Sequence, residues 1–332
     1  METNSTVLVT GGAGYVGSVL VPKLLAAGHA VKVLDLFLYG HAPLGAVAAH
    51  PRFTAIAGDL RDEQLLAQIL PGCQAVVHLA AISNDPSFDL DPELGKSVNY
   101  DSFRPLVRLA RDSGVERFIF ASSSSVYGPK EEAEVTEDLP LNPLTGYSRY
   151  KAICEEELLA ERQPGFTTVS IRPATVCGYS PRLRLDVVVN ILTNQAYHRR
   201  QITVLGGEQK RPNIHVEDIA DVYVQMLQYP AAAIDGRVFN AGMRNHTVLE
   251  IAHIVREVVG PDVEIEVTPY EDRRSYHISS ETLRRELGWE AQRSLEDAVR
   301  GLLAAFDAGL VPEALTDPKF FNVETMRARP LS

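Results

Sequence analysis

Short apolar runs alternate with amphipathic segments along the first half of the chain. The apolar runs lie at 6–10, 30–36, 53–60, 75–81 and 117–125. Segments with helical periodicity separate them, at about 14–27, 62–70 and 92–112. Strands that alternate with helices in this way form parallel sheets with both faces covered. The pattern therefore predicts an α/β fold with a doubly wound parallel sheet.

The alternation becomes less regular after Gly178. A helix at about 146–162 and a strand at 167–176 precede this point. The elements expected after it lie at about 185–198, 202–207, 211–227, 236–242, 247–259, 263–270, 279–289 and 294–306. Serines begin the last two as helix N-caps. We expect a larger domain and a smaller mixed α/β C-terminal lobe that binds the substrate. The larger domain would take residues 1–177 and about 212–243, and the lobe about 178–211 and 244–332.

Composition narrows the class of protein. The chain has 332 residues, enough for two domains, and its net charge of −11 argues against nucleic-acid or anionic-membrane binding. Its three cysteines lack C-x-x-C spacing, and no histidine or carboxylate cluster has metal spacing, so neither disulfides nor a metal are expected. The start lacks a secretory signal pattern, and no apolar run reaches ~18 residues. We therefore expect a cytoplasmic protein with no membrane partner.

A glycine loop follows the first strand. In GGAGYVG, Gly11, Gly14 and Gly17 stand where a tight turn, a close pyrophosphate and helix packing each exclude a Cβ. The helix N-terminus adds N–H groups and a dipole that favour phosphate. Asp35 ends the second strand, where a carboxylate can accept both ribose hydroxyls and repels a 2′-phosphate. These residues predict NAD as the cofactor rather than NADP.

The segment TGYSRYK places two tyrosines near Lys151. Residues four apart share a helix face, whereas adjacent residues diverge by ~100°. Tyr147 is therefore the partner of Lys151, and Tyr150 is expected to pack toward Cys154. An unperturbed phenol has a pKa of ~10, and a neighbouring ammonium is expected to lower that pKa. The phenolate can then take a proton from a substrate hydroxyl while hydride leaves the same carbon.

Further motifs accompany this pair: GDL at 58–60, HLAA at 78–81, Asn99, SSSSVYG at 122–128 and RPNIHVEDIA at 211–220. Together the motifs resemble the extended short-chain dehydrogenase/reductase family, most closely its nucleotide-sugar epimerase and dehydratase branch, over nearly the whole chain. The resemblance implies a Rossmann domain, bound NAD and a catalytic set of Ser123, Tyr147 and Lys151. It assigns to the cofactor the glycine loop and Asp35 together with Tyr15, Val16, Asp59, Leu60, Leu79, Ala80, Ala81, Asn99, Tyr147 and Lys151.

The resemblance further implies a nucleoside diphosphate sugar as substrate, held between the lobes of a homodimer subunit. Arg211 matches an arginine that grips the pyrophosphate in relatives, since guanidinium binds phosphate through paired hydrogen bonds. Within EDRRSY, Arg274 is favoured over Arg273 as a second clamp. Thr175 stands where some epimerases carry an asparagine, and Ser123 would bond the reacting sugar oxygen. Two more substrate candidates follow the fourth strand at its carboxyl end, where sheet ligands bind: Ser83 and Asn84.

The serine run also argues against one reaction. Sugar 4,6-dehydratases that resemble this pattern carry acidic residues directly before VYG, whereas this chain has Ser124 and Ser125, which cannot serve as acid or base near pH 7. The leading interpretation is an NAD-dependent nucleotide-sugar 4-epimerase that transiently oxidises the carbon 4 hydroxyl.

Three other interpretations share the fold. One is an NAD-dependent nucleotide-sugar 4-dehydrogenase or ketoreductase, with heptoses among its possible sugars. A second is a non-catalytic NAD-sensing regulator, which would have no use for a proton-transferring Tyr–Lys pair. A third is a sterol-type dehydrogenase, which Arg211 disfavours because it suits a diphosphate ligand. The sequence leaves open the nucleotide base, the sugar and the ring carbon that reacts.

Overall fold

The structure is a computed structural model that describes residues 5–270 and 275–329. Within these residues seven strands, all parallel, form the central sheet in the order β10-β6-β5-β4-β1-β2-β3. Their bounds are β1 (Thr6–Thr10), β2 (Ala30–Asp35), β3 (Phe53–Ala57), β4 (Ala75–His78), β5 (Arg117–Ala121), β6 (Thr167–Pro173) and β10 (Arg237–Ala241). The strand order changes direction between β1 and β4, and this is the place where open α/β sheets bind ligands.

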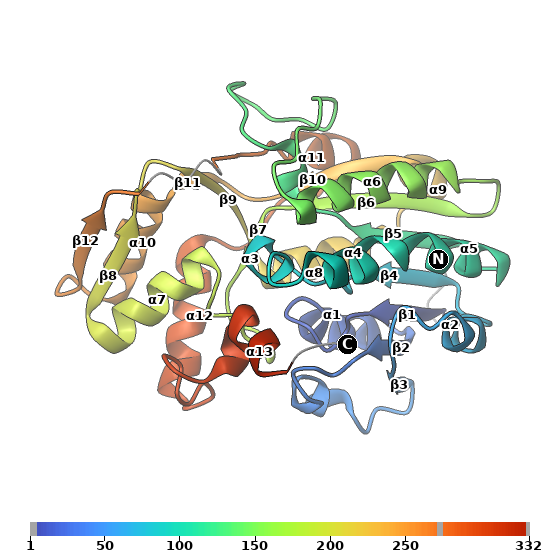
Figure 1. The fold of residues 1–332 in the computed structure, drawn as a ribbon, viewed down its shortest axis with the longest axis horizontal. Coiled ribbons are helices and arrows are strands. Elements are labelled where there is room, and N and C mark those ends of the chain that lie inside the picture. Colours follow the sequence, from blue (N-terminus) through green and yellow to red (C-terminus); the bar gives the residue numbers. More distant parts are fainter. Residues whose placement is uncertain (1–4, 271–274, 330–332) are drawn as a thin grey trace.

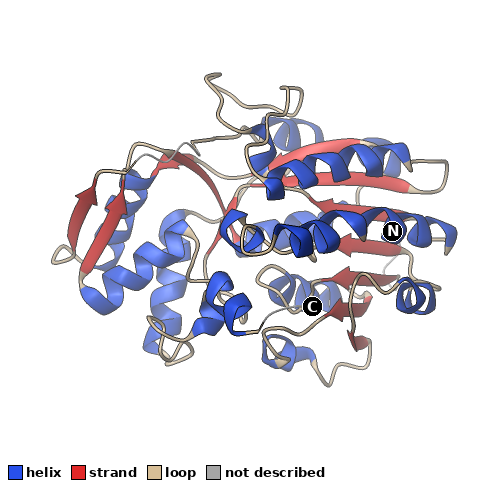
Figure 2. Cartoon of the chain, in the orientation of Figure 1, coloured by secondary structure: helices blue, strands red, loops and turns tan. Residues whose placement is uncertain are grey.

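Alternate side chains of the central strands pack into two separate cores. Val7 and Val9 of β1 cluster with residues of α1 (Gly17–Ala26) and α8 (Val216–Met226). Leu8, between them, clusters with residues of α2 (Glu63–Ile69), α5 (Phe103–Asp112) and α6 (Gly146–Ala160). All three β1 side chains are fully buried, and Figure 2 shows the sheet with helices on both faces. The predicted doubly wound Rossmann-type sheet is confirmed.

The smaller lobe lies beside this sheet (Figure 1). It contains two small sheets, β11 (Asn245–Thr247) with β9 (Lys210–His215) and β7 (Thr175–Cys177), and β12 (Glu264–Thr268) with β8 (Gln201–Leu205). Helices α7 (Val188–Arg199), α10 (Val248–Val259) and α12 (Leu295–Asp307) share a third core with them. The mixed α/β character of the lobe is as predicted. The residue boundaries between domain and lobe stay a prediction.

The remaining elements are short, and the last of them returns to the central domain. Their bounds are η1 (Ala42–Val47), α3 (Asp85–Phe88), η3 (Ser124–Tyr127), α9 (Ala231–Ile234), α11 (Glu281–Leu287), η4 (Pro318–Phe320) and α13 (Asn322–Ala328). Just beyond α13, Arg329 donates to the carbonyl of Leu38, which follows β2, at 2.7 Å. Figure 1 shows α13 between the smaller lobe and α1. Among the described residues no helix combines the length and apolarity needed to cross a bilayer.

The helix expected at 92–112 is interrupted. It divides into α4 (Pro92–Lys96), a π-helical turn η2 (Ser97–Asp101) and α5. Pro105 explains the break, because it has no N–H for the carbonyl of Asp101 and its ring crowds that carbonyl. The wider π turn accommodates this, and Ser102 N–H bonds the carbonyl of Ser97 at 3.2 Å.

Two other expectations change in detail. The strand expected at 167–176 ends at Pro173, and the chain then leaves the central sheet to form β7 beside β9. Ser294 caps α12 as predicted, in a capping box with Asp297. Ser280 occupies the N-cap position of α11 without capping it, because its hydroxyl donates to Gly242 O and accepts from Gly242 N.

Candidate active site

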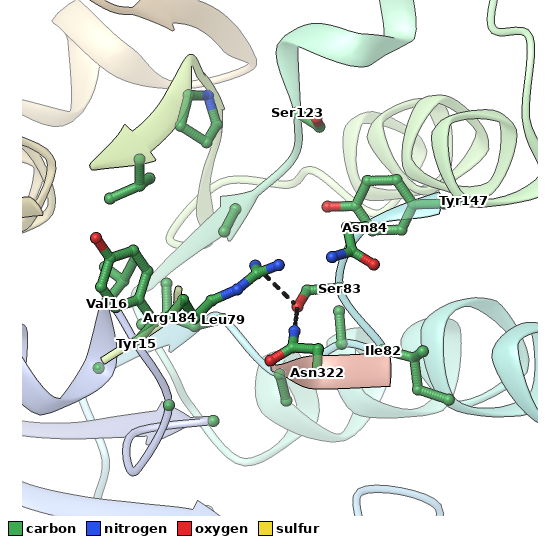
Figure 3. Close-up of a pocket in the computed structure, with 18 of the residues that line it drawn as sticks. Tyr15, Val16, Leu79, Ile82, Ser83, Asn84, Ser123, Tyr147, Arg184 and Asn322 are labelled. Carbon is green, nitrogen blue, oxygen red and sulfur yellow. Dashed lines mark hydrogen bonds between the residues drawn. The ribbon is translucent and has the colours of Figure 1, made fainter. Parts of the chain in front are cut away.

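A cavity of about 570 Å³ opens at the carboxyl ends of β1 and β4, between the central sheet and the smaller lobe. Residues from the glycine loop, from the segments after β2, β4 and β5, and from α6 form one wall. The segment 182–188, Arg211, Tyr276 and α13 form the other. Figure 3 shows Tyr15 and Tyr147 on opposite sides of this space, with Arg184 and Ser83 between them. The site is thus built by segments that are far apart in the sequence.

The glycine loop has no room for side chains. Gly11 adopts a φ of +72°, and a Cβ there would lie 2.7 Å from the backbone nitrogen of Ala80. A Cβ on Gly17 would lie 2.5 Å from the Cα of Gly12. The loop can therefore present bare backbone N–H groups at the N-terminus of α1, which is what a pyrophosphate requires. On this observation the cradle fits a dinucleotide.

Asp35 lies at the carboxyl end of β2 and forms part of the cavity wall. Its carboxylate accepts from the backbone N–H of Ala13 at 2.9 Å and of Phe37 at 2.8 Å. Burial nevertheless raises the pKa of Asp35 above its ordinary value. Its place in the cavity wall lets the carboxylate accept hydrogen bonds from a ribose.

Asp35 leads us to expect NAD selectivity. The wild-type protein should bind NAD at least about 100-fold more tightly than NADP. A 2′-phosphate placed against the Asp35 carboxylate would lose several kcal/mol of binding free energy. Asp35→Asn keeps the shape of the side chain and removes its charge, so it should lower the ratio of NAD affinity to NADP affinity. Titration of cofactor-free protein with both dinucleotides measures it. Tighter binding of NADP by the wild type would contradict the assignment.

Tyr147 and Lys151 share one face of α6, as their spacing predicts. Thr145 caps the helix in a capping box with Ser148, which fixes the first turn that carries Tyr147. Both side chains reach the cavity, with Lys151 Nζ 5.9 Å from the centre of the Tyr147 ring. Tyr150 points elsewhere. It stacks on Tyr100 at a ring distance of 5.1 Å, and its expected packing toward Cys154 stays a prediction.

The electrostatics of this pair differ from the expectation. Burial raises the pKa of Tyr147 and the negative charge of Asp85 raises it further, while the Arg184 cation and the Ser123 hydroxyl lower it. The Lys151 ammonium donates to the carbonyl of Ala121 at 2.6 Å, and burial lowers its own pKa to about 8. The net shift of the Tyr147 pKa is therefore upward, opposite to the expected lowering, because desolvation dominates.

Ser123 lies directly after β5 as the N-cap of η3, where its hydroxyl accepts from the N–H of Ser125. The two hydroxyls are 2.8 Å apart. Ser122 turns the opposite way, away from the reacting groups, and donates to the buried carboxylate of Glu155. Of the serine run, Ser123 is the member whose hydroxyl lowers the pKa of Tyr147.

Glu155 belongs to a buried ion pair beneath the catalytic residues. Arg172 Nη2 lies 2.6 Å from Glu155 Oε2, and the two side chains are 5 % and 6 % exposed. Arg172 Nη1 donates to the hydroxyl of Tyr127 at 2.7 Å, and Tyr127 donates to Asn240 Oδ1 at 2.8 Å. The network joins α6, β6, η3 and β10 behind the cavity and fixes the helix that carries Tyr147 and Lys151.

The cavity brings together nearly all the residues that the sequence singled out. Those that form its wall are Gly11, Gly14, Tyr15, Val16, Gly17, Asp35, Asp59, Leu60, Leu79, Ala80, Ala81, Ser83, Asn84, Ser123, Tyr147, Lys151, Thr175 and Arg211. Asn99 lies behind the wall, where its side-chain amide bonds both the N–H of Ile82 (2.8 Å) and its carbonyl (3.0 Å). These two bonds hold the conformation of the loop that follows β4. Arg273 and Arg274 lie outside the described residues.

Asn84 has the most unusual backbone in the site. Its φ of 73° and ψ of 157° fall in a region that is almost confined to glycine and costs about 1–3 kcal/mol. Its side chain caps α3 by accepting from the N–H of Ser87 at 2.9 Å. Strain held in place at a cavity wall is common at functional sites, which agrees with a ligand-contacting role for this loop.

Sequence reasoning missed four polar cavity residues, Arg182, Arg184, Asp186 and Asn322, whereas Asp85 and Tyr276 belong to segments that it had marked, 83–88 and 271–276. Asp85 on α3 accepts from the hydroxyl of Thr145 at 2.6 Å and faces Tyr147 electrostatically. The two arginines belong to PRLRLD, where charged and apolar residues alternate. That alternation could have indicated two arginines on one side of an extended segment. No local signal marks Asn322.

The fold and the site together define an NAD-linked enzyme of the short-chain dehydrogenase/reductase type. A model of the NAD dependent epimerase/dehydratase family matches residues 7–242, so the chain belongs to that family. It is 30% identical to a UDP-glucose 4-epimerase of Lacticaseibacillus casei over 86% of this chain and 91% of that protein. The sequence-based predictions of the family, of NAD and of an enzyme are confirmed.

Two solved structures share the whole fold. A UDP-glucose 4-epimerase of Thermotoga maritima, solved with UDP-glucose, has a TM-score of 0.83 and 27% identity, covering 92% of this chain and 99% of that one. A dTDP-glucose 4,6-dehydratase of Streptomyces venezuelae, solved with NAD, also has a TM-score of 0.83, at 26% identity, covering 95% and 99%. The fold therefore suits both reactions, and the choice between them depends on the residues of the site.

Proposed function

We propose that this protein is an NAD-dependent 4-epimerase of a nucleoside diphosphate hexose, with a UDP-sugar as the first candidate substrate. The observation that carries the proposal is the meeting of Ser123, Tyr147 and Lys151 in one cavity with the bare glycine loop. The UDP-glucose 4-epimerases among the relatives support the choice of sugar class.

The side chains have distinct tasks in this reaction. Tyr147 takes the proton of the sugar hydroxyl and returns it, and Ser123, which lies in the same cavity wall, shares that proton with it. When bound, oxidised NAD supplies the hydride acceptor and a positive charge beside the phenol. That charge and the Lys151 ammonium oppose the effect of burial on the Tyr147 pKa. Both are needed, because the chain alone holds the phenol in its neutral form.

Arg211, on β9 of the smaller lobe, is the residue that we assign to binding the pyrophosphate of the substrate. Its guanidinium stands 5.5 Å from the ring of Tyr276, and both residues belong to the cavity wall. Thr175, at the start of β7, faces the same space with a hydroxyl. A nucleotide tethered here would keep the oxidised sugar in the cavity while its ring turns to present the other face.

Hydride is expected to leave and return at one carbon. UDP-glucose or UDP-galactose labelled with deuterium at carbon 4 should give the 4-epimer with the label still at carbon 4, because the same carbon donates and receives the hydride. Mass spectrometry and proton NMR of the product measure this. NADH should not accumulate.

The alternatives give different products. Stoichiometric NADH together with a released keto sugar would establish the dehydrogenase interpretation and overturn the epimerase. A 4-keto-6-deoxy sugar would establish dehydration and would direct attention to Asp85, the carboxylate that faces Tyr147 from α3. If UDP-hexoses did not react but another nucleoside diphosphate hexose were epimerised, the proposed reaction would stand and the proposed nucleotide base would be wrong.

A further inference from the structure

The segment between β7 and α7 is bound directly to the start of α1. Tyr15 in the glycine loop donates to the carbonyl of Gly178 at 2.6 Å. The hydroxyls of Ser18 and Ser180 are 2.7 Å apart, and both groups are fully buried. These contacts fix the segment against the N-terminus of α1, on the side opposite β4. The two arginines that follow, Arg182 and Arg184, both belong to the cavity wall.

Arg184 reaches across the middle of the cavity (Figure 3). Its Nε and Nη2 bond the two carboxylate oxygens of Asp186 at 2.9 and 3.1 Å, and its Nη1 lies 3.4 Å from the Ser83 hydroxyl. Burial works against its charge, but Asp186 more than compensates, so the pKa of Arg184 is raised. A guanidinium has five N–H groups, so the three bonds leave donors available to a ligand. The bidentate pair with Asp186 sets the plane of the guanidinium.

Arg182 is a buried cation that forms no ion pair with a carboxylate of the described residues. Its side chain is 4 % exposed, and its guanidinium lies 3.5 Å over the ring of Tyr39. One terminal nitrogen donates to Asn322 Oδ1 on α13, whereas Nε and Nη1 have no hydrogen-bond partner. Unpaired N–H groups on a buried cation are costly, and burial lowers the pKa of Arg182. Both nitrogens are covered in this arrangement, so it is the positive charge of Arg182 that a nearby anion would meet.

We propose that Arg182 and Arg184 bind the pyrophosphate of the dinucleotide from the side opposite the glycine loop. The loop supplies backbone N–H groups and the helix dipole, and the arginines supply charged, forked donors. Asn322 positions the arginine pair, since it bonds Arg182 and also donates to Ser83 at 2.9 Å. The inference concerns the cofactor, so it is tested by binding alone and stands or falls separately from the sugar reaction.

The test compares three ligands on cofactor-free, full-length protein. Arg184→Gln should weaken ADP-ribose and NAD about 10- to 100-fold, the range expected for charge-assisted hydrogen bonds. Adenosine, which lacks phosphate, and UDP, which probes the substrate half, should bind as in the wild type. The salt dependence of ADP-ribose binding should become shallower. Arg182→Gln should act in the same direction, and Arg184→Lys should lose less, because it keeps the charge but not the fork.

Two further variants separate this role from a structural one. Arg184→Gln with Asp186→Asn removes the carboxylate that would otherwise be left unpaired, and it should bind ADP-ribose as weakly as Arg184→Gln alone. Arg200→Gln is the matched control, because Arg200 pairs with Asp262 on the surface, and it should change no affinity. Recovery of ADP-ribose affinity in the double variant would overturn the proposal. So would equal losses for adenosine and ADP-ribose, or a loss confined to UDP.

Discussion

Tyr147→Phe is expected to reduce turnover by about 10²–10⁴-fold, the usual contribution of a positioned general acid–base group. The phenol lies in the cavity wall, and Lys151, the nearest titratable group on α6, is held by its bond to the carbonyl of Ala121. NAD should stay bound, because the glycine loop and Asp35 are untouched. Turnover is measured with saturating nucleotide sugar, and bound NAD is measured by its release on denaturation.

Tyr150→Phe is the matched control on the same helix. Its ring stacks on Tyr100 outside the cavity, so loss of its hydroxyl should change turnover by less than a few-fold. Equal losses in the two variants, or a larger one in Tyr150→Phe, would show that the assignment of the proton-transferring tyrosine is wrong. Loss of NAD from Tyr147→Phe would instead point to a cofactor-binding role.

Glu155→Gln is expected to lower the free energy of unfolding by about 3–5 kcal/mol, because it leaves Arg172 as an uncompensated buried cation. Glutamine keeps an oxygen that can still accept from Ser122, so the loss comes from the missing charge. Chemical denaturation of the cofactor-free protein measures the loss. Saturating NAD should restore part of it, since a ligand that binds only the folded state stabilises that state.

Two further variants test whether burial of the unpaired charge causes the loss of stability. Glu155→Leu combined with Arg172→Met replaces both charges by apolar groups and should recover much of the stability. Asp262→Asn breaks the exposed pair with Arg200 and should cost no more than about 1 kcal/mol. If Asp262→Asn were as damaging as Glu155→Gln, burial would not be the reason for the loss.

Local patterns carried most of the prediction. The glycine loop, Asp35 and the Tyr147–Lys151 spacing follow from rules that act within one turn or one strand–helix junction, and the structure keeps all of them in one cavity. The parallel, doubly wound sheet followed from the alternation of apolar runs and helices, whereas the order of its strands is known only from the structure. The homodimer and the cytoplasmic location stay predictions.

What the sequence did not give depends on distant contacts. The Tyr147 pKa is governed by burial and by Asp85 on another helix, which no i,i+4 rule can show. Asn99 is one of the family's motif residues, but only the fold shows that its side-chain amide bonds the backbone N–H and carbonyl of Ile82. Arg182 and Arg184 became visible as cavity residues once Tyr15 and Ser18 were seen to hold their segment in place.

Asn322 lies far along the chain from β1, yet it accepts from Tyr39 at 3.1 Å, donates to Ser83 and holds Arg182. During translation, the glycine loop and β2 leave the ribosome long before this residue is made. The Rossmann strands can assemble on the nascent chain, but the cavity wall that Asn322 completes cannot. We therefore expect stable capture of NAD to be a late, post-translational step, after the residues of α13 have emerged and docked.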